Sequence, residues 1–382
     1  MLKQVIIIGG HIQALGLVRQ ARATGIRVVL FIEDAFSVAR FSNMVSKTVV
    51  FGDVDRLGAF LIPYQDTGTL LLPTADQYVE YIAANQEALA SHFVLGIPQS
   101  ENVELFGDKR KTYKFATDIG IPHPQSWFPD SLEDVDIIAS KATFPLVVKP
   151  AVMYSFHRIF GKKAFRCNNI EELRSRCEAI QERMPLSSVV VQEFLSGGAK
   201  TLYSFGTFAV EGEPKAWVEA NRIRQNPMDF GNSTTFAVTC YISEIEECAR
   251  KILRETHYTG LAEVEFMYDE SCKCYKFLEI NTRAWKWHSI SIGLGFGFLS
   301  EMIYYLNHQP GTFRENSQSV AWVERLTDFA IIAKETLKGR MNLFQAVKSY
   351  RQKKVSAVWS WKDPLPALMY LILSPVLYIK RH

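Results

Sequence analysis

Polar side chains alternate along a short β-rich stretch in the last third of the sequence. Residues 277–283 read Phe-Leu-Glu-Ile-Asn-Thr-Arg, so that Glu279, Asn281 and Arg283 occur at every second position. Because side chains of a strand repeat every two residues, these three groups share one face. Glu265 lies 14 residues before Glu279, on a similar strand pattern. Two carboxylates and an amide oxygen on paired strands are hard oxygen ligands suited to Mg²⁺, which offsets charge between phosphate oxygens in nucleotide-dependent enzymes.

Two lysines lie where elements are expected to begin or end. Lys109 lies at the expected start of a helix, and Lys149 ends an expected strand over residues 144–150. Either lysine alone would be a surface residue more often than not. Together with the carboxylates they become candidate site residues.

A third feature is a strand over residues 189–194 that leaves through Gly197 and Gly198. A strand that runs into a double-glycine turn can pass an adenine ring with its backbone exposed. The segment Gln192-Glu193-Phe194-Leu195 is therefore the candidate adenine contact.

In combination, these features resemble the ATP-grasp superfamily, which includes biotin carboxylase, D-alanine ligase and D-aspartate ligase. The similarity covers roughly residues 1–310, and Glu265 with the Glu-x-Asn-x-Arg motif is its most specific element. Residues 221–227, followed by Gly231, are most similar to D-aspartate-ligase-like carboxylate–amine ligases. The resemblance implies an α/β protein of ATP-grasp fold with an α+β lid and an N-terminal Rossmann-like pre-ATP-grasp domain. It also resembles the ATP-grasp domains of the carbamoyl-phosphate synthase large chain.

The resemblance assigns cofactor roles residue by residue, with ATP and Mg²⁺ (or Mn²⁺) as the implied cofactors. The implied metal ligands are Glu265, Glu279 and Asn281. The implied ATP contacts are Lys109, Lys149, Lys163, Gln192, Glu193, Leu195 and Arg224.

Two residues are implied to be catalytic. Arg283 resembles the arginine that faces the carboxylate substrate or its acyl-phosphate, and Lys149 is the second candidate. Arg222 and Arg224 have an alternative interpretation as members of structural ion pairs. Glu263 alternates with Glu265 but is left out of the metal set.

The implied reaction joins a small-molecule carboxylate to an amine through an acyl-phosphate, releasing ADP and phosphate. Arginine can bind a carboxylate with two parallel hydrogen bonds, which lysine cannot do equally well. One alternative is a bicarbonate-using carboxylase or carbamoyl-phosphate-synthase-like enzyme. Another is a non-catalytic ATP-binding scaffold or regulator, because residues 151–160 of the implied lid contain no glycine and only Gly161 precedes Lys163.

The N-terminal hundred residues alternate between β-rich runs and helical patterns. Strands are expected over 5–8, 26–32, 49–51 and 70–72, which predicts a doubly wound α/β unit with ligands at the strand ends. The glycines after the first strand do not have the G-x-G-x-x-G spacing, which weighs against a nicotinamide dinucleotide. Four consecutive parts are expected: 1–105 (pre-ATP-grasp domain), 106–195 (linker helix and lid), 196–310 (central subdomain with the Mg²⁺ site) and 311–382 (helical region with an apolar tail).

Composition narrows the classes of function. The 382 residues are 48% hydrophobic with a net charge of +3, which favours a folded globular protein and gives no support for a nucleic-acid binder. Six scattered cysteines indicate reduced thiols rather than a disulfide scaffold. Cys272-Lys273-Cys274 is interpreted as part of a hairpin turn rather than half a metal site. A cytoplasmic protein is expected. A homodimer is the expected oligomer, because dimers are the commonest oligomers of soluble proteins.

The C-terminal tail has two interpretations. Residues 364–379 contain no charged side chain, and the prolines within them make this stretch too short and broken to span a bilayer. In the first interpretation the tail packs on the protein's own surface. In the second it makes peripheral contact with the inner face of a membrane, with basic residues at both ends and two nearby tryptophans.

Overall fold

The computed structural model describes residues 1–381 apart from 152–155, 157–158, 162–163, 229–230 and 232. The chain divides into two units, each assembled from separated stretches of sequence. Unit 1 comprises Met1–Val103, Ser204–Glu263 and Asn281–His382, and unit 2 comprises Glu104–Tyr203 and Val264–Ile280. The four consecutive parts expected from the sequence cannot express such an arrangement, and their boundaries stay a prediction.

Unit 1 begins with a parallel five-stranded sheet in the order β3-β2-β1-β4-β5. Strand β1 (Gln4–Ile8) is a run of β-branched residues that is buried from Val5 onward, as a central parallel strand requires. The expected α/β pattern of the N-terminal region is therefore confirmed. The other strands are β2 (Arg27–Ile32), β3 (Lys47–Val50), β4 (Thr69–Pro73) and β5 (Val94–Leu95).

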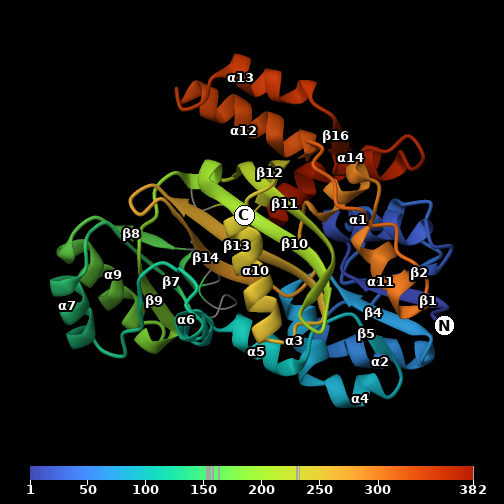
Figure 1. Cartoon of the computed structure of the whole chain (residues 1–382), viewed down its shortest axis with the longest axis horizontal. Helices are drawn as coiled ribbons and strands as arrows, with labels where there is room; N and C mark the ends of the chain where they lie inside the picture. The colour runs from blue at the N-terminus through green and yellow to red at the C-terminus, as the bar shows by residue number, and fades with distance from the viewer. Residues whose placement is uncertain (152–155, 157–158, 162–163, 229–230, 232, 382) are drawn as a thin grey trace. The chain divides into compact units, whose positions relative to one another are not determined.

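The helices of this region follow the strands along the chain (Figure 1). Helix α1 directly follows the glycine turn after β1, and its buried side chains join the same core as Val5 and Ile7. The helices are α1 (Ile12–Arg22), α2 (Leu57–Leu61), α3 (Asp76–Ala84), α4 (Gln86–Ala90) and α5 (Ser100–Gly107).

A second sheet has seven strands in the order β14-β13-β10-β11-β12-β15-β16. Strands β13 and β14 each have residues in both units, because the division falls after Glu263 and after Ile280. The strands are β10 (Leu202–Val210), β11 (Glu213–Asn226), β12 (Ser233–Cys240), β13 (Gly260–Asp269), β14 (Cys274–Asn281), β15 (Ala321–Val323) and β16 (Lys354–Ser356).

The C-terminal region, expected to be helical, contains three helices and two short strands among its described residues. Its two short strands complete the seven-stranded sheet, with β15 paired antiparallel to β12 and parallel to β16. Sequence patterning missed them because three-residue strands show almost no periodicity. The remaining helices of unit 1 are α10 (Ser243–Glu255), α11 (Phe298–Leu306), α12 (Arg325–Leu337), α13 (Leu343–Lys348) and α14 (Leu365–Arg381).

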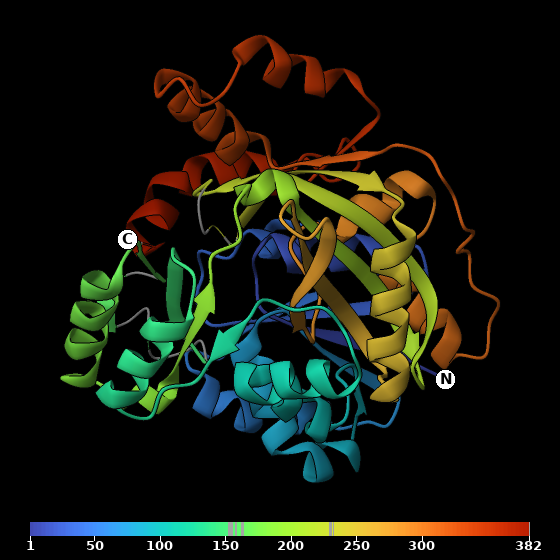
Figure 2. The same ribbon diagram turned by 60° about the vertical axis from the view of Figure 1, so that its left-hand side comes forward.

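Unit 2 contains a four-stranded sheet in the order β6-β9-β7-β8. Helices α7 and α9 lie side by side against this sheet and share one core with it (Figure 2). Helix α7 begins with a capping box between Ser131 and Asp134, which satisfies backbone groups at its first turn. The strands are β6 (Ser126–Trp127), β7 (Leu146–Pro150), β8 (Phe165–Cys167) and β9 (Val189–Glu193), and the helices are α6 (Lys109–Asp118), α7 (Leu132–Lys141) and α9 (Ile170–Gln181).

Short 3₁₀ turns connect several of these elements. They are Val38–Phe41, Val54–Arg56, Ile62–Tyr64, Leu186–Ser188, Gly198–Thr201, His288–Leu294 and Ser349–Arg351. Within the described residues, no single helix has the length and apolar composition needed to cross a membrane. By length and composition alone, the pair His288–Leu294 and Phe298–Leu306 meets that test together, with a bend of 83° between them.

Candidate functional site

Lys109 is held in place by the start of helix α6. The carboxylate of Asp108 accepts the backbone N–H of Arg110 and caps the helix, so that Lys109 is its first residue. The Nζ of Lys109 lies 2.8 Å from Oε2 of Glu279 on β14. Burial by itself lowers the pKa of this ammonium group, but the negative charges of Glu279 and Glu265 outweigh burial and raise the pKa. Lys109 therefore remains charged.

Tyr113 contacts Lys149, lies close enough to Lys109 to act on it electrostatically, and was not found from the sequence. It lies one turn after Lys109 on α6, is buried, and donates its hydroxyl to the backbone oxygen of Leu278 at 2.9 Å. Lys149 on β7 donates to the same hydroxyl at 3.5 Å, and its Nζ lies 5.9 Å from the centre of the ring. The spacing of four residues between Lys109 and Tyr113 is the available sequence signal, since such residues share a helix face.

The structure thus brings four of the predicted residues of unit 2 into one neighbourhood: Lys109, Lys149, Glu265 and Glu279. Lys109 interacts directly with Glu279, and Glu265 is buried close enough for its charge to act on Lys109. Among the described residues, no group of three or more His, Cys, Asp or Glu is arranged to hold a metal ion. The predicted ligand set has two carboxylates and one amide, and its role as a metal site stays a prediction.

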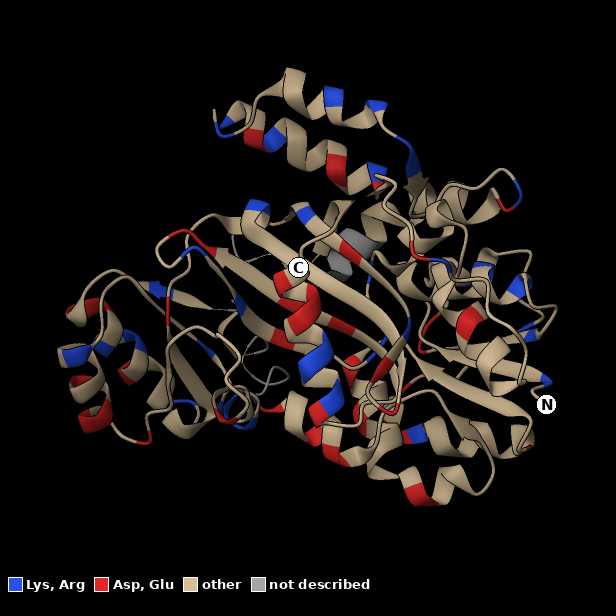
Figure 3. Ribbon diagram, in the orientation of Figure 1, with Lys and Arg blue, Asp and Glu red and all other residues tan. Residues whose placement is uncertain are grey.

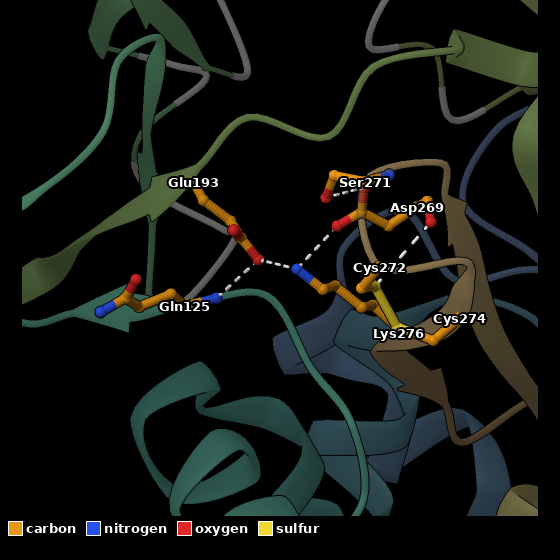
Figure 4. The surroundings of a disulfide bond; sticks show 7 residues. All are labelled: Gln125, Glu193, Asp269, Ser271, Cys272, Cys274 and Lys276. Atoms are coloured by element: carbon orange, nitrogen blue, oxygen red, sulfur yellow. Dashed lines mark hydrogen bonds and ion pairs between the residues drawn. A yellow bond between two sulfur atoms is a disulfide. The ribbon is translucent and has the colours of Figure 1, made fainter.

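The predicted adenine contact lies at the end of β9. Gln192 is buried and donates to Oγ of Ser126 at 2.6 Å. The carboxylate of Glu193 accepts the backbone N–H of Gln125 at 2.9 Å and also the ammonium group of Lys276 (Figure 4). Half-buried Leu195 follows two residues after the strand.

Lys276 joins this strand end to the β13–β14 hairpin. Its Nζ also lies 2.8 Å from Oδ2 of Asp269 (Figure 4). Burial lowers the pKa of Lys276, but its contacts with Asp269 and Glu193 raise the pKa further than burial lowers it. Lys276 was not evident from the sequence because its position in β14 is out of phase with the Glu279 face.

A disulfide bond joins Cys272 to Cys274 in the turn between β13 and β14 (Figure 4). Residues 270–273 form the expected turn. The expectation of reduced thiols is wrong for this pair, whose Cα atoms lie 5.4 Å apart, within the usual range for a disulfide. The described cysteines Cys167, Cys177, Cys240 and Cys248 are free.

In unit 1, Asn281 ends strand β14 and faces Glu263 on β13. Its amide Nδ2 donates to Oε2 of Glu263 at 3.0 Å, and the indole N–H of Trp287 donates to Oε1 at 2.7 Å. Glu263 therefore orients the amide of Asn281, a role that its alternation with Glu265 did not reveal.

Arg283 lies after the end of β14, which corrects the expectation that it continues the strand face. Its guanidinium group forms two hydrogen bonds with the carboxylate of Asp76 at the start of α3, at 2.7 and 3.0 Å. A third bond, at 3.3 Å, reaches Oδ1 of Asn281. Asp76 is an exposed residue, so this pair is accessible to water.

Arg224 is buried in a structural ion pair, which is the alternative that the sequence left open. Its Nε and Nη2 each lie 2.8 Å from an oxygen of Asp328 on α12. Thr235 and Tyr350 also donate to Asp328, and the guanidinium group stacks over Phe236 at 4.0 Å. A contact between Arg224 and nucleotide stays a prediction. Lys163, the predicted lid residue, lies outside the described residues.

Comparison with known proteins places this arrangement in a recognised fold. Residues 224–294 match the family model described as carbamoyl-phosphate synthase L chain, ATP binding domain. Among solved structures, N5-carboxyaminoimidazole synthetase from Staphylococcus aureus has a TM-score of 0.68 and 15% sequence identity, covering 88% of this chain and 86% of that one.

Two biotin carboxylase structures resemble this chain equally well. The biotin carboxylase domain of Hydrogenobacter thermophilus 2-oxoglutarate carboxylase, a dimer in complex with MgADP, ADP and bicarbonate, has a TM-score of 0.65 and 15% identity. The β-γ-ATP complex of biotin carboxylase from Campylobacter jejuni has the same values, and both alignments cover 82% of this chain and 72% of the other. The chain has the ATP-grasp fold, as the sequence resemblance predicted.

Proposed function

We propose that this ATP-grasp chain is an ATP- and Mg²⁺-dependent ligase that joins a carboxylate to an amine through an acyl-phosphate. The observation that carries the proposal is the contact between Lys109 Nζ and Glu279 Oε2, at 2.8 Å, on elements far apart in sequence. A charged ammonium group suits a phosphate oxygen, and a carboxylate beside it suits a divalent cation. The fold and the MgADP complex of a structural neighbour support this assignment.

The donor set suits a hard divalent cation. The side chain of Glu279 is 30% exposed, so one of its partners can be exchanged for a ligand. We assign Glu265, Glu279 and Asn281 to Mg²⁺ (or Mn²⁺), which when bound would offset charge on the phosphate oxygens. Glu263 then serves as a positioning residue, because it holds the amide of Asn281 through a 3.0 Å hydrogen bond.

The ATP contacts follow from the same neighbourhood. Lys109 and Lys149 would pair with phosphate oxygens, and Tyr113 orients the ammonium group of Lys149 through its buried ring and hydroxyl. Gln192, Glu193 and Leu195 would contact the adenine. Lys276 fixes the carboxylate of Glu193 and limits its freedom to turn. Lys163 stays a predicted further phosphate contact.

Arg283 would bind the acid substrate. A substrate carboxylate can replace Asp76 on the guanidinium group of Arg283, because the side chain of Asp76 is 61% exposed and water already competes for its carboxylate. An oxygen of the bound acid attacks the γ-phosphorus of ATP, ADP leaves, and an acyl-phosphate forms. The amine nitrogen then attacks the acyl carbon, phosphate leaves, and the amine loses a proton to give the amide.

Two alternatives have specific support. Bicarbonate in place of an organic acid is favoured by its presence in the Hydrogenobacter thermophilus complex, and it predicts ADP release that depends on bicarbonate. A scaffold without turnover is favoured by the glycine-free stretch 151–160, and it predicts ATP binding without ADP release.

The proposal also includes a homodimer, as in the Hydrogenobacter thermophilus structure. Light scattering after size-exclusion chromatography would test the oligomeric state.

The test is ADP and phosphate release from Mg-ATP with a panel of acids paired with amines. We expect release of ADP and phosphate that requires one acid and one amine together and that is lost in Glu279→Gln. Glu270→Gln is the matched control, because Glu270 is exposed in the turn of the same hairpin and should retain full activity. Release that requires bicarbonate, or tight ATP binding with no release across the panel, would contradict the ligase assignment.

A further inference from the structure

The C-terminal part of unit 1 exposes an unusual amount of apolar surface. Of the 21 large apolar side chains that are exposed among the described residues, twelve lie within 325–376, about one-seventh of the chain. The exposed side chains of 325–376 are called here the C-terminal surface. Such concentrations of apolar side chains mark interaction sites more often than scattered single residues do.

Helix α14 has apolar residues on both of its faces. Ala367, Tyr370 and Leu373 pack against the core of unit 1, and the hydroxyl of Tyr370 donates to Glu324 at 2.6 Å. This packing fixes how the helix lies. The opposite side presents Leu365, Leu368, Leu371 and Ile372, all exposed, where a helix facing water would carry polar side chains.

Two further parts of the C-terminal surface have the same character. The hairpin of α12 and α13 exposes Leu337 (89%) and Phe344 (73%) at its connection. The turn before α14 exposes Trp361 (85%), which packs edge-on against Trp359 with ring centres 5.0 Å apart. Tryptophan pairs apolar bulk with one N–H donor, which suits the boundary between lipid and water.

Charge is distributed asymmetrically over the same segment. Residues 325–376 contain nine lysines and arginines against three aspartates and glutamates, although the whole chain has a net charge of only +3. Every described lysine and arginine of the segment is exposed, whereas Asp328, Glu335 and Asp363 are buried. Figure 3 colours lysines and arginines blue and aspartates and glutamates red along the ribbon.

The buried acids do little to offset the exposed bases. Asp328 is neutralised by Arg224 at 2.8 Å and Asp363 by Arg19 at 3.1 Å, both from outside the segment. Glu335 is paired within the segment, with Arg340 at 2.7 Å. The C-terminal surface therefore offers water only apolar, neutral and basic groups.

We propose that the C-terminal surface docks this protein onto the surface of an anionic lipid membrane, without spanning it. Exposed leucine, phenylalanine and tryptophan can enter the headgroup region while the surrounding lysines and arginines pair with anionic headgroups. A second copy of the chain fits less well, because two strongly basic surfaces repel each other. Nucleic acid would satisfy the bases but would leave the apolar face of α14 in water.

The test is co-flotation of the full-length protein with vesicles of phosphatidylcholine alone or with about 30% phosphatidylglycerol. We expect flotation with the anionic vesicles, little with the neutral ones, and release at about 0.5–1 M salt, where screening is strong. Two variant sets separate the contributions of apolar contact and charge.

The apolar variant is Leu365→Ser with Leu368→Ser and Ile372→Ser, and a second, independent variant is Leu337→Ser with Phe344→Ser. We expect each variant to bind the anionic vesicles at least about tenfold more weakly than the wild-type protein. The control is Ile62→Ser, because Ile62 is similarly exposed in unit 1 outside the segment. Circular dichroism melting of each variant shows whether it remains folded.

The charge variant is Lys348→Gln with Arg351→Gln and Lys362→Gln. We expect about 100-fold weaker partitioning, since each basic residue near an anionic surface contributes about fivefold. The control changes the same net charge elsewhere, through Lys141→Gln, Lys215→Gln and Lys251→Gln, all exposed.

Absence of flotation with anionic vesicles by the folded wild-type protein would overturn the proposal. So would equal losses in the two charge variants. Light scattering that shows a dimer lost in the Leu365, Leu368 and Ile372 variant, with no vesicle binding, would instead assign the surface to a second copy.

Discussion

Two lysine–glutamate pairs in this protein have nearly the same geometry and different surroundings. Lys109 and Glu279 in unit 2 are 2.8 Å apart, and Lys286 and Glu324 in unit 1 are 2.7 Å apart. The lysine side chains are equally covered, but the side chain of Glu279 is 30% exposed whereas that of Glu324 is 1% exposed. The exposure of the carboxylate, rather than the length of the contact, distinguishes the two pairs.

The pair of Lys286 and Glu324, called here the closed pair, belongs to a network in which the carboxylate of Glu324 accepts several hydrogen bonds. Glu324 accepts hydrogen bonds from Lys286, Thr327 and Tyr370. Burial by itself would raise the pKa of Glu324, but Lys286 and these bonds lower it. A carboxylate of this kind holds the fold together and has no access to a ligand. The pair of Lys109 and Glu279, called here the open pair, retains a carboxylate that water, and hence a ligand, can reach.

The largest expected effect comes from breaking the closed pair. Glu324→Ala leaves the ammonium group of Lys286 without its buried carboxylate and should lower the free energy of unfolding by about 3–5 kcal/mol. Urea denaturation compared with wild type measures the loss. Glu279→Gln, assayed in parallel, should lower stability by less, because the glutamine amide oxygen can still accept a hydrogen bond from Lys109 and water reaches this 30% exposed side chain. Equal losses in the two variants would remove the distinction between the pairs.

The open pair should determine activity instead. Lys109→Met removes an ammonium group proposed to offset phosphate charge, and we expect ADP release to fall about 100- to 1,000-fold, equivalent to about 2.7–4 kcal/mol. Lys114→Met is the matched control, because Lys114 is exposed on the same helix. A fall of the same size in both variants would attribute the loss to helix α6 rather than to the site.

Glu219 is a buried carboxylate that no cation contacts in the described part of the chain. It accepts the backbone N–H of Ile242 at 2.8 Å, and burial raises its pKa from 4.5 to about 7. Between these values the folded protein keeps a proton that the unfolded chain releases. The free energy of unfolding should therefore fall by roughly 3 kcal/mol from this group as pH rises through that range.

Urea denaturation at several pH values, comparing wild type with Glu219→Gln, measures this contribution. Glutamine remains neutral at every pH. The free energy of unfolding of the variant should therefore not fall over this pH range, and above about pH 7 the variant should be more stable than wild type. Parallel pH profiles for the two proteins would mean that the carboxylate is not protonated at neutral pH in the folded state.

The two arginine–aspartate pairs repeat the contrast between open and closed. Arg224 with Asp328 is almost fully buried, whereas Asp76, the partner of Arg283, is exposed. Arg283→Lys replaces a two-bond fork with a point charge and should raise KM for the acid substrate about tenfold, or about 1.4 kcal/mol, with stability unchanged. Arg224→Lys is expected to lower stability without changing KM. The reverse pattern would make Arg224 the substrate contact.

The sequence predicted features that depend on local order. The alternation of Glu279 and Asn281 placed them on one strand, and the β-branched run of residues 5–8 predicted the first parallel strand. Features that depend on distant contacts could not be predicted. Nothing near Arg224 in the sequence indicates that Asp328, 104 residues later, neutralises it. Likewise, composition alone gave no reason to separate Cys272 and Cys274 from the free thiols.

A small effect on stability is expected from removing that disulfide. It links residues only two positions apart, so it restricts the unfolded chain little, and Cys272→Ser with Cys274→Ser should lower the free energy of unfolding by about 1–2 kcal/mol. ADP release should be unchanged, because the contacts of Lys276 with Asp269 and Glu193 do not involve sulfur. Thiol titration of the denatured wild-type protein should give four thiols before reduction and six after it. Six thiols before reduction would show that the turn is closed without the bond, and a loss of ADP release in the double variant would place the hairpin turn among the elements that position Glu193.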